Sequence, residues 1–500
     1  MSELDGHHWV TDDDSCSAAS EFHAPEGSVD PIYEAKARLL NHAVREIGMG
    51  RYQWYLFVVA GFGWFSCLIG GLILSPVVSE FQFQSEFLSL ALNIGLFVGA
   101  VFWALGCDIW GRRWSFNFTL LIAGVFGLAA GGSPNFLTLA SLLAVVGFGV
   151  GGNMPVDSAV FLDFVPGSHQ YLLTILSIWW SVGQLIASFI AWPLISHFSC
   201  AETATTCSRS ENMGWRYLLF TLGGMTLLLW ACRFFLFRLE ESPRYLVGRG
   251  RDAEAVEVIH RIAAFNGCTS SLTLEQLTVA GESAAASDPS GAAAAQRRKL
   301  LSESSVWSSH HIRALFKTTK LAWSTSLLIV LWGIIGLAST LYNSFLPYLL
   351  AHRGAKFGDS SYYITYRNTM GGRAATHRTQ RRLGHLRGRG SLVSFSSRVP
   401  PPAALMLCSG GTAGEYAFAS NIMYGVLYAI SPEVFPAKDR GTGNGLTATA
   451  TRVFGIIAPV IALYANLNTA VPVYVSGALI IGSGVLALLL PYEPRGKTSI

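Results

Sequence analysis

Charged residues are scarce in this chain of 500 residues. Only 13% of the residues are Asp, Glu, Lys or Arg, whereas 51% are hydrophobic, and the mean hydropathy is +0.40. Soluble globular proteins carry about 25% charged residues. The composition therefore excludes that class and indicates a helical protein that crosses a membrane several times. The net charge of +4 is too small to indicate a nucleic-acid partner, and we expect none.

Several motifs are also missing. Residues 1–28 are acidic and polar, without a basic start and an apolar core, so we expect a disordered cytosolic tail over 1–50 and no cleavable signal peptide. The eight cysteines include no CxxC pair, and neither HExxH nor GxSxG occurs. We therefore expect no metal, no cofactor and no enzymatic activity. His310 and His311 are adjacent in a polar stretch, where solvent-facing side chains are expected.

Ten apolar runs are long enough to cross a bilayer, which takes about 20 residues. Six precede a polar stretch at 238–320 and four follow it, which predicts bundles at 51–237 and 321–490 around a cytosolic central loop, with a cytosolic tail at 491–500. Part of the loop has apolar residues at helical spacing. The runs lie at 53–76, 87–107, 114–132, 136–162, 171–196, 215–237, 322–350, 413–434, 446–465 and 470–490.

The basic residues predict the orientation. Arg112, Arg113 and Arg244 fall on one side of the membrane if six spans precede the loop, and short cytoplasmic loops are enriched in Lys and Arg. Both termini are then cytosolic, and we expect the plasma membrane, with a vacuolar or other internal membrane as the alternative. The loop with Cys200 and Cys207 faces outside, where the two form a disulfide or remain unrelated thiols.

Four motifs follow one another along the chain: CDIWGRR (107–113), GGNMPVDSAVFLDFVP (151–166), EESPRYL (240–246) and SPEVFPAKDRGTGNG (431–445). In this order they resemble the major facilitator superfamily, in the sugar-porter-like branch that includes fungal and synaptic-vesicle-related carriers. The resemblance implies 12 helices in two six-helix bundles and transport by alternating access. The sequence departs from the family at Ala104, where glycine is usual, and we expect so small a residue to be tolerated.

The resemblance also implies charge networks that close the cytoplasmic side. Asp163 and Glu433 each stand three residues before a proline, at positions that map one half onto the other. Asp163 is expected to pair with the Arg112–Arg113 region, and Glu433 with a second-half network. Arg440 matches the family's arginine, whereas its first-half counterpart is Gln170. The predicted gating residues are Asp108, Gly111, Arg112, Arg113, Asp163, Glu241, Arg244, Glu433 and Arg440.

Asp157 lies about 9 Å along a helix from Asp163, deeper in the membrane, and Leu427 occupies the repeat-related position. Such a costly ionisable group indicates either a proton-coupling or substrate-cation site or a structural acid bonded to a neighbouring helix. Arg452 either binds an anionic substrate or anchors a helix end. Five other side chains are expected to line a sugar-like cavity or to serve only in packing: Asn93, Trp180, Gln184, Tyr342 and Asn343.

Glycines are frequent inside the predicted spans, as in GFGVGG at 147–152. Small residues let helix backbones approach closely. These glycines therefore predict tight helix packing, with a substrate-facing kink at Pro155 as the alternative.

No apolar run of 20 residues occurs between 351 and 412. Instead, seven arginines lie between Arg373 and Arg398, followed by three prolines at 400–402. One arginine at the centre of a span costs about 2.5–3.5 kcal/mol, so segment 369–412 cannot form the eighth and ninth helices of the family. We favour an out-of-frame or mispredicted exon, with an extracytoplasmic insertion or a phosphoinositide- or nucleic-acid-binding patch as alternatives.

Together these features predict an all-α membrane protein of the major facilitator type with about ten recognisable spans. The expected function is secondary active transport of a small polar solute, sugar-like or an organic ion, coupled to protons. The expected partners are the solute, protons and the lipid bilayer, and the expected state is a monomer. The alternative is a transport-inactive sensor or scaffold, or the product of a frame-disrupted gene, because the eighth helix lines the cavity of such carriers.

Overall fold

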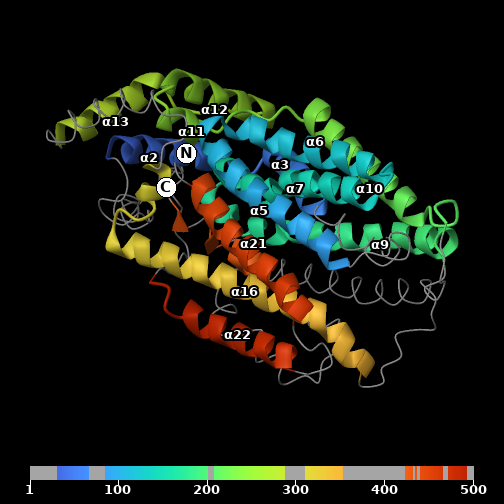
Figure 1. The fold of residues 1–500 in the computed structure, drawn as a ribbon. Helices are drawn as coiled ribbons and strands as arrows, with labels where there is room; N and C mark the ends of the chain where they lie inside the picture. Colours follow the sequence, from blue (N-terminus) through green and yellow to red (C-terminus); the bar gives the residue numbers. More distant parts are fainter. Residues whose placement is uncertain are drawn as a thin grey trace, which may run out of the picture.

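The structure, a computed structural model, describes residues 31–66, 85–200, 208–287, 310–352, 423–428, 430–431, 434–435, 440–464 and 471–491. Every regular element in these ranges is helical (Figure 1). The first half contains α2 (Pro31–Ile47), α3 (Arg51–Phe65), α5 (Ser85–Ile109), α6 (Arg112–Gly131), α7 (Phe136–Phe164), η2 (Gly167–His169), α8 (Leu172–Leu176), α9 (Ile178–Phe198), α10 (Gly214–Ala231) and η3 (Cys232–Leu236).

The central loop and the second half continue the chain. Four short helices follow η3, and three long ones complete the described part. They are α11 (Pro243–Gly248), α12 (Asp252–Asn266), α13 (Leu274–Ser287), α15 (His310–Ala314), α16 (Thr319–His352), α21 (Arg440–Tyr464) and α22 (Val471–Ala487).

Six of the described segments are long and apolar enough to cross a membrane. They are Phe87–Ile109, Arg112–Gly131, Phe136–Phe164, Leu172–Phe198, Gly214–Leu236 and Thr319–Tyr342. Each coincides with an apolar run predicted from the sequence. Helices therefore form where about 20 or more residues are apolar enough to lie in the hydrocarbon core of a bilayer. Segment 369–412 and its predicted replacement of the eighth and ninth spans lie outside the described residues.

The glycines of α5 and α7 bring these two helices into backbone contact. A Cβ added at Gly95 or Gly99 would overlap the carbonyl of Ala144 or Phe148, and one at Gly151 would reach the Leu96 carbonyl. Glycine is therefore required for this approach. The packing interpretation of the GFGVGG run is correct for Gly147, Gly149, Gly151 and Gly152, each of which would clash with a neighbouring helix if it carried a side chain.

Helix α21 joins the two halves. It runs beside α5 of the first half and α16 of the second half, and α22 packs on the far side of α16 (Figure 1). It begins at Arg440, six residues before the predicted apolar run at 446–465. The early start extends the helix with a polar first turn, whose backbone N–H groups have no acceptor within the helix.

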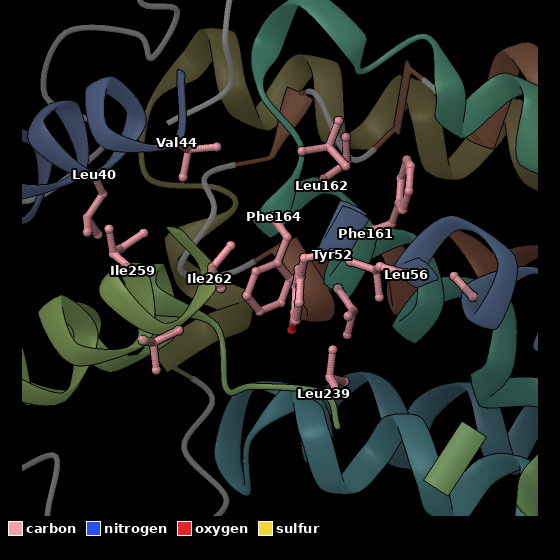
Figure 2. Packing of buried hydrophobic residues seen from close by; sticks show 14 of the residues in the cluster. Leu40, Val44, Tyr52, Leu56, Phe161, Leu162, Phe164, Leu239, Ile259 and Ile262 are labelled. Carbon is pink, nitrogen blue, oxygen red and sulfur yellow. The ribbon is translucent and has the colours of Figure 1, made fainter. Parts of the chain in front are cut away.

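Residues 31–47 correct the prediction of a disordered tail over 1–50. They form α2, because Tyr33, Ala37, Leu40 and Val44 recur at helical spacing and are buried. Leu40 and Val44 face Ile259 and Ile262 of α12, and the same cluster continues to Tyr52 and Phe164 (Figure 2). The apolar side chains of the central loop therefore pack against α2 and the start of α3.

Candidate functional site

Asp163, at the end of α7, is the centre of a buried charge cluster. Its carboxylate pairs with Arg112 of α6, accepts a hydrogen bond of 3.2 Å from Nη1 of Arg440, and lies 3.9 Å from Nη1 of Arg244. Asp163, Arg112 and Arg440 are at most 1% exposed. Because α7 belongs to the first half and Arg440 opens α21, this carboxylate connects the two halves.

A second connection lies beside the first. Asp108, near the end of α5, accepts hydrogen bonds from both the backbone N–H of Thr442 (2.7 Å) and its Oγ1 (2.8 Å). Thr442 lies in the first turn of α21, where a carboxylate is favoured by the free N–H groups and the helix dipole. Asp108 also lies 3.7 Å from Nη2 of Arg112, so the two connections share one arginine.

Glu241 holds the beginning of α6. It accepts hydrogen bonds from the backbone N–H groups of Arg112 (2.9 Å) and Arg113 (3.4 Å). Gly111 precedes them with φ 104°, and a Cβ there would lie 2.6 Å from Glu241 Oε2. Only glycine fits both the backbone conformation and this space. Arg113 thus contributes its backbone to this contact, whereas the guanidinium of Arg112 joins the charge cluster.

Arg244 links the cluster to the central-loop helices. Nη2 of Arg244 donates to Oδ1 of Asn41 in α2, while Nη1 faces Asp163. Burial lowers the pKa of Arg244 to about 10, still well above neutral pH, so the side chain remains charged. Arg249 adds to the same region by donating to the carbonyls of Asp108 (3.1 Å) and Ile109 (2.9 Å) at the end of α5.

Asp157 forms a separate ion pair within the first half. Its partner is Arg233 of η3, and both side chains are fully buried. The guanidinium of Arg233 lies over the Phe116 ring, 3.0 Å from its centroid. On the other side, Gly63 of α3 leaves room for the carboxylate, because a Cβ there would overlap Asp157 Oδ2. Asp157 is thus bonded to a neighbouring helix element, the arrangement that the sequence allowed as the structural alternative.

A small pocket lies between the halves, beside these groups. Pro155 and Ser158 of α7 line one side, and the second half supplies Trp332, Tyr428, Ser431, Asn444, Thr447 and Ala448. The space accommodates roughly one water molecule. Pro155 therefore faces the interface between the halves, as its substrate-facing alternative required.

Of the residues predicted to line a cavity, two face the opposite half. Trp180 of α9 lies 5.9 Å from the Tyr424 ring. Asn93 of α5 donates to Ser89 O (2.9 Å) within its own helix, and its Oδ1 is 3.7 Å from the Cβ position of Gly455. Gln184 and Tyr342 are half-buried in α9 and α16. None of the four lines the pocket between the halves.

Arg452 corrects one interpretation. It was expected at the beginning of a helix, as an anchor or an anion site, but α21 begins at Arg440, about 18 Å earlier along the helix axis. Arg452 is half-buried in the middle of α21. Its interpretation as an anchor of the helix end is therefore wrong.

Three predicted sites lie partly or wholly outside the described residues. Glu433 is one, and Asn343 belongs to α16 while its side chain is not described. Cys200 is disulfide-bonded, but Cys207 lies outside the described residues, so their pairing stays a prediction.

Sequence reasoning missed Arg233, Thr442, Asn444 and Asn41. The sequence did contain a signal for Arg233. This arginine lies within the sixth apolar run, and the fourth apolar run contains an acid, Asp157. Thr442 and Asn444 stand in the motif GTGNG at 441–445, which carried no separate interpretation. Asn41 lay in the segment expected to be disordered.

Comparison with known proteins shows which proteins this chain resembles. A family model described as "Sugar (and other) transporter" matches residues 51–334. The chain is 69% identical over 493 residues to "MFS siderochrome iron transporter 1" of Ceriporiopsis subvermispora, covering 95% of this chain and 94% of that protein. It is 39% identical over 500 residues to "Major facilitator-type transporter hxnZ" of Emericella nidulans, covering 95% and 89%.

A solved structure agrees with the family model in fold. The proton:xylose symporter XylE bound to 6-bromo-6-deoxy-D-glucose aligns with a TM-score of 0.64 and 15% sequence identity, covering 89% of this chain and 97% of that one. At this identity the likeness shows the fold alone.

Proposed function

Because the chain belongs to the major facilitator superfamily, in its sugar-porter-like branch, and is thus a multi-pass membrane transporter, we propose that it carries a small polar solute by alternating access, driven by protons. The observation that carries the proposal is the pair of contacts across the halves, Asp163 with Arg440 and Asp108 with Thr442. Both lie at one end of the helices, where α5 and α7 end and α21 begins.

These contacts form the gate in our proposal. Their geometry suits a device that opens, because each donor group belongs to α21 and each acceptor to the first half. When the halves separate, all three hydrogen bonds break together, and water replaces them on both sides. The basic residues around this end support a cytoplasmic position for it. The described structure then corresponds to a state closed toward the cytoplasm.

Asp157 is our candidate for proton coupling. Among the described residues its carboxylate forms an ion pair with Arg233 only, and both side chains are fully buried. Protonation of Asp157 would remove the ion pair and leave Arg233 without a counter-ion, which is costly in a buried site. Proton binding therefore has a structural consequence at η3, and η3 leads directly into Glu241, which holds α6 at the gate.

The test uses purified protein in liposomes with a pH-sensitive dye inside. Solutes from the sugar, carboxylate, vitamin, organic-cation and ferric siderophore classes are added outside, and a substrate of a proton symporter acidifies the lumen. Asp157→Asn alone leaves Arg233 uncompensated, at a cost of about 3–5 kcal/mol, so the informative variant is Asp157→Asn with Arg233→Gln. Loss of solute-driven acidification with preserved solute exchange supports coupling at Asp157. Unchanged acidification rejects it.

The inactive-carrier alternative depends on segment 369–412. If the transcript encodes two apolar runs around a basic loop in another frame over these codons, this chain is a disrupted form of the carrier, and restoring the frame should restore uptake. If neither of the other frames does so, the out-of-frame explanation fails. An unrestored chain that transports at full rate would reject the inactive carrier.

A further inference from the structure

We propose that the pocket between the halves binds an uncharged, flat ring that carries one amide-like edge, such as a neutral N-heteroaromatic carboxamide, with Asn444 as the group that recognises this edge. The proposal rests on the transport function and names the substrate class for it. Its basis is one amide side chain without a hydrogen-bond partner among the described residues, which lies beside aromatic residues in the pocket.

Asn444 is the polar group that the pocket leaves open. It is 5% exposed, and neither its Nδ2 nor its Oδ1 has a hydrogen-bond partner among the described residues. An unpaired amide costs about 1–3 kcal/mol by protein measurements. A ligand that offers one donor and one acceptor side by side would satisfy both atoms at once.

Three hydroxyl groups of the pocket each take part in one hydrogen bond already. Ser158 donates its hydroxyl hydrogen to Met154 O (2.7 Å), and Thr447 donates to Asn444 O (2.9 Å). Ser431 accepts from Trp332 Nε1 (2.7 Å). A sugar presents hydroxyl groups around its whole ring, and each needs a partner when buried. Among the described lining side chains, only Asn444 has polar atoms without any hydrogen bond, so the polar groups that most need a partner lie at one edge, whereas a sugar is polar around its whole ring.

Aromatic rings supply the walls. The Tyr428 ring lies edge-on to Trp332, with centroids 4.6 Å apart, and edge-on to Trp64, 4.9 Å apart. Trp332 and Tyr428 both line the pocket. Aromatic faces favour a flat π-system, which gains about 0.5–1.5 kcal/mol beyond burial from stacked or edge-to-face contact.

The ligand should carry no net charge at this edge. The described residues that line the pocket include no Asp, Glu, Lys or Arg. Asp157 neighbours Ser158 in sequence, but it is paired with Arg233 inside the first half. An ionic group would therefore lose its hydration without gaining a counter-charge. A neutral amide meets no such penalty.

The pocket can widen because its walls belong to different halves. Pro155 and Ser158 move with the first half, while Asn444 and Trp332 move with the second. Asn444 follows Thr442 of the gate by two residues, about 3 Å along α21. A solute bound at Asn444 therefore lies next to the contact that must break for release.

The experiment measures equilibrium binding of radiolabelled nicotinamide to the full chain in nanodiscs. Nicotinate and 1-methylnicotinamide test charge on either side of neutrality, glucose tests the sugar class, and a ferric trihydroxamate tests a metal chelate. We expect nicotinamide to bind at least tenfold more tightly than nicotinate or glucose. Asn444→Leu should weaken nicotinamide binding at least tenfold, while Asn117→Leu, a buried Asn→Leu change in α6, should leave it unchanged.

Asn444→Asp provides a readout that a folding defect does not produce. A carboxylate at this position should reverse the preference, so that 1-methylnicotinamide binds more tightly than nicotinamide. Equal nicotinamide binding by wild type and Asn444→Leu would overturn the proposal, as would glucose or the ferric chelate binding in place of nicotinamide. Solute-driven acidification in liposomes tests proton-coupled transport independently, so either proposal can fail while the other stands.

Discussion

The methyl group of Ala104 in α5 packs against the bare α-carbon of Gly445 in α21. A Cβ at 445 would overlap this methyl group and lie 3.0 Å from the Ala104 Cα. The departure from the family's glycine at 104 is therefore matched by a glycine on the opposite helix. The expectation that alanine is tolerated has this physical basis.

Gly445→Ala should keep the gate from closing. Overpacking costs about 1–3 kcal/mol, and here it falls on the closed state alone, because the two helices separate on opening. The first-turn amide of Thr442 depends on Asp108 for its acceptor, so its hydrogen exchange reports the opening. We expect faster exchange over residues 440–446 in Gly445→Ala. Ala104→Gly combined with Gly445→Ala should slow the exchange again, but not fully, because the added Cβ still lies 3.0 Å from the α-carbon of residue 104 and 3.3 Å from Ala100 O; a double variant that exchanges as fast as Gly445→Ala alone would contradict the packing explanation.

Asp163→Asn should destabilise the protein more than Arg440→Gln does. Loss of the carboxylate leaves Arg112, Arg244 and Arg440 facing one another in a buried site, at a cost of about 3–5 kcal/mol. Loss of Arg440 leaves Asp163 with its other two arginines. The stabilities of the two variants are compared by heating each one and measuring, by size-exclusion chromatography, the fraction that stays folded. The opposite ranking would show that Asp163 is not the centre of the cluster.

Thr442→Val removes one hydrogen bond of the gate and leaves the backbone one. A bond to a charged acceptor contributes about 1.5–3 kcal/mol, so the variant should open more often and exchange faster over 440–446. Thr226→Val is the matched control, because Thr226 donates its hydroxyl only to Leu222 O of its own helix among the described residues. If both variants exchange alike, the bond to Asp108 is not what holds the gate.

Asn41→Ala tests whether α2 supports the gate. The substitution removes the partner of Arg244 Nη2, which frees that arginine to leave Asp163. We expect faster exchange at 440–446 and readier tryptic cleavage after Arg244. Arg38→Ala is the control, because Arg38 lies on the exposed face of α2, where it pairs with Glu34. Equal effects of the two changes would mean that α2 acts only through its general packing.

The apolar runs predicted the described spans well, because a bilayer leaves the backbone few alternatives to a helix. The boundaries were less predictable. Helix α21 gained a polar first turn from Arg440 because Asp108 supplies an acceptor from another helix, a contact that no local pattern contains. Helix α2 was missed because its apolar face is buried only when the central-loop helices α11, α12 and α13 pack on it, whereas the acidic stretch before it dominated the composition.

The pairing of Asp163 with Arg112 agrees with what the family resemblance implied. Arg440 was expected in a second-half network, and the structure shows it bonded to Asp163 of the first half. The sequence indicated that the two networks are unequal, because Gln170 stands at the position that is repeat-related to Arg440. Asp157 was recognised as unusual from its depth, but its partner was not, since Arg233 lies 76 residues away.

One turn of α21 carries both the gate contact at Thr442 and the recognition amide at Asn444. The same rigid part of α21 therefore holds the gate and recognises the solute, so no other element has to transmit solute binding to the gate. A solute bound in the pocket contacts the same turn of α21 that makes the gate contact, whereas an empty pocket leaves the gate contact unchanged. Such an arrangement selects solutes by residence time as well as by affinity, because a solute that fits poorly dissociates before the gate opens.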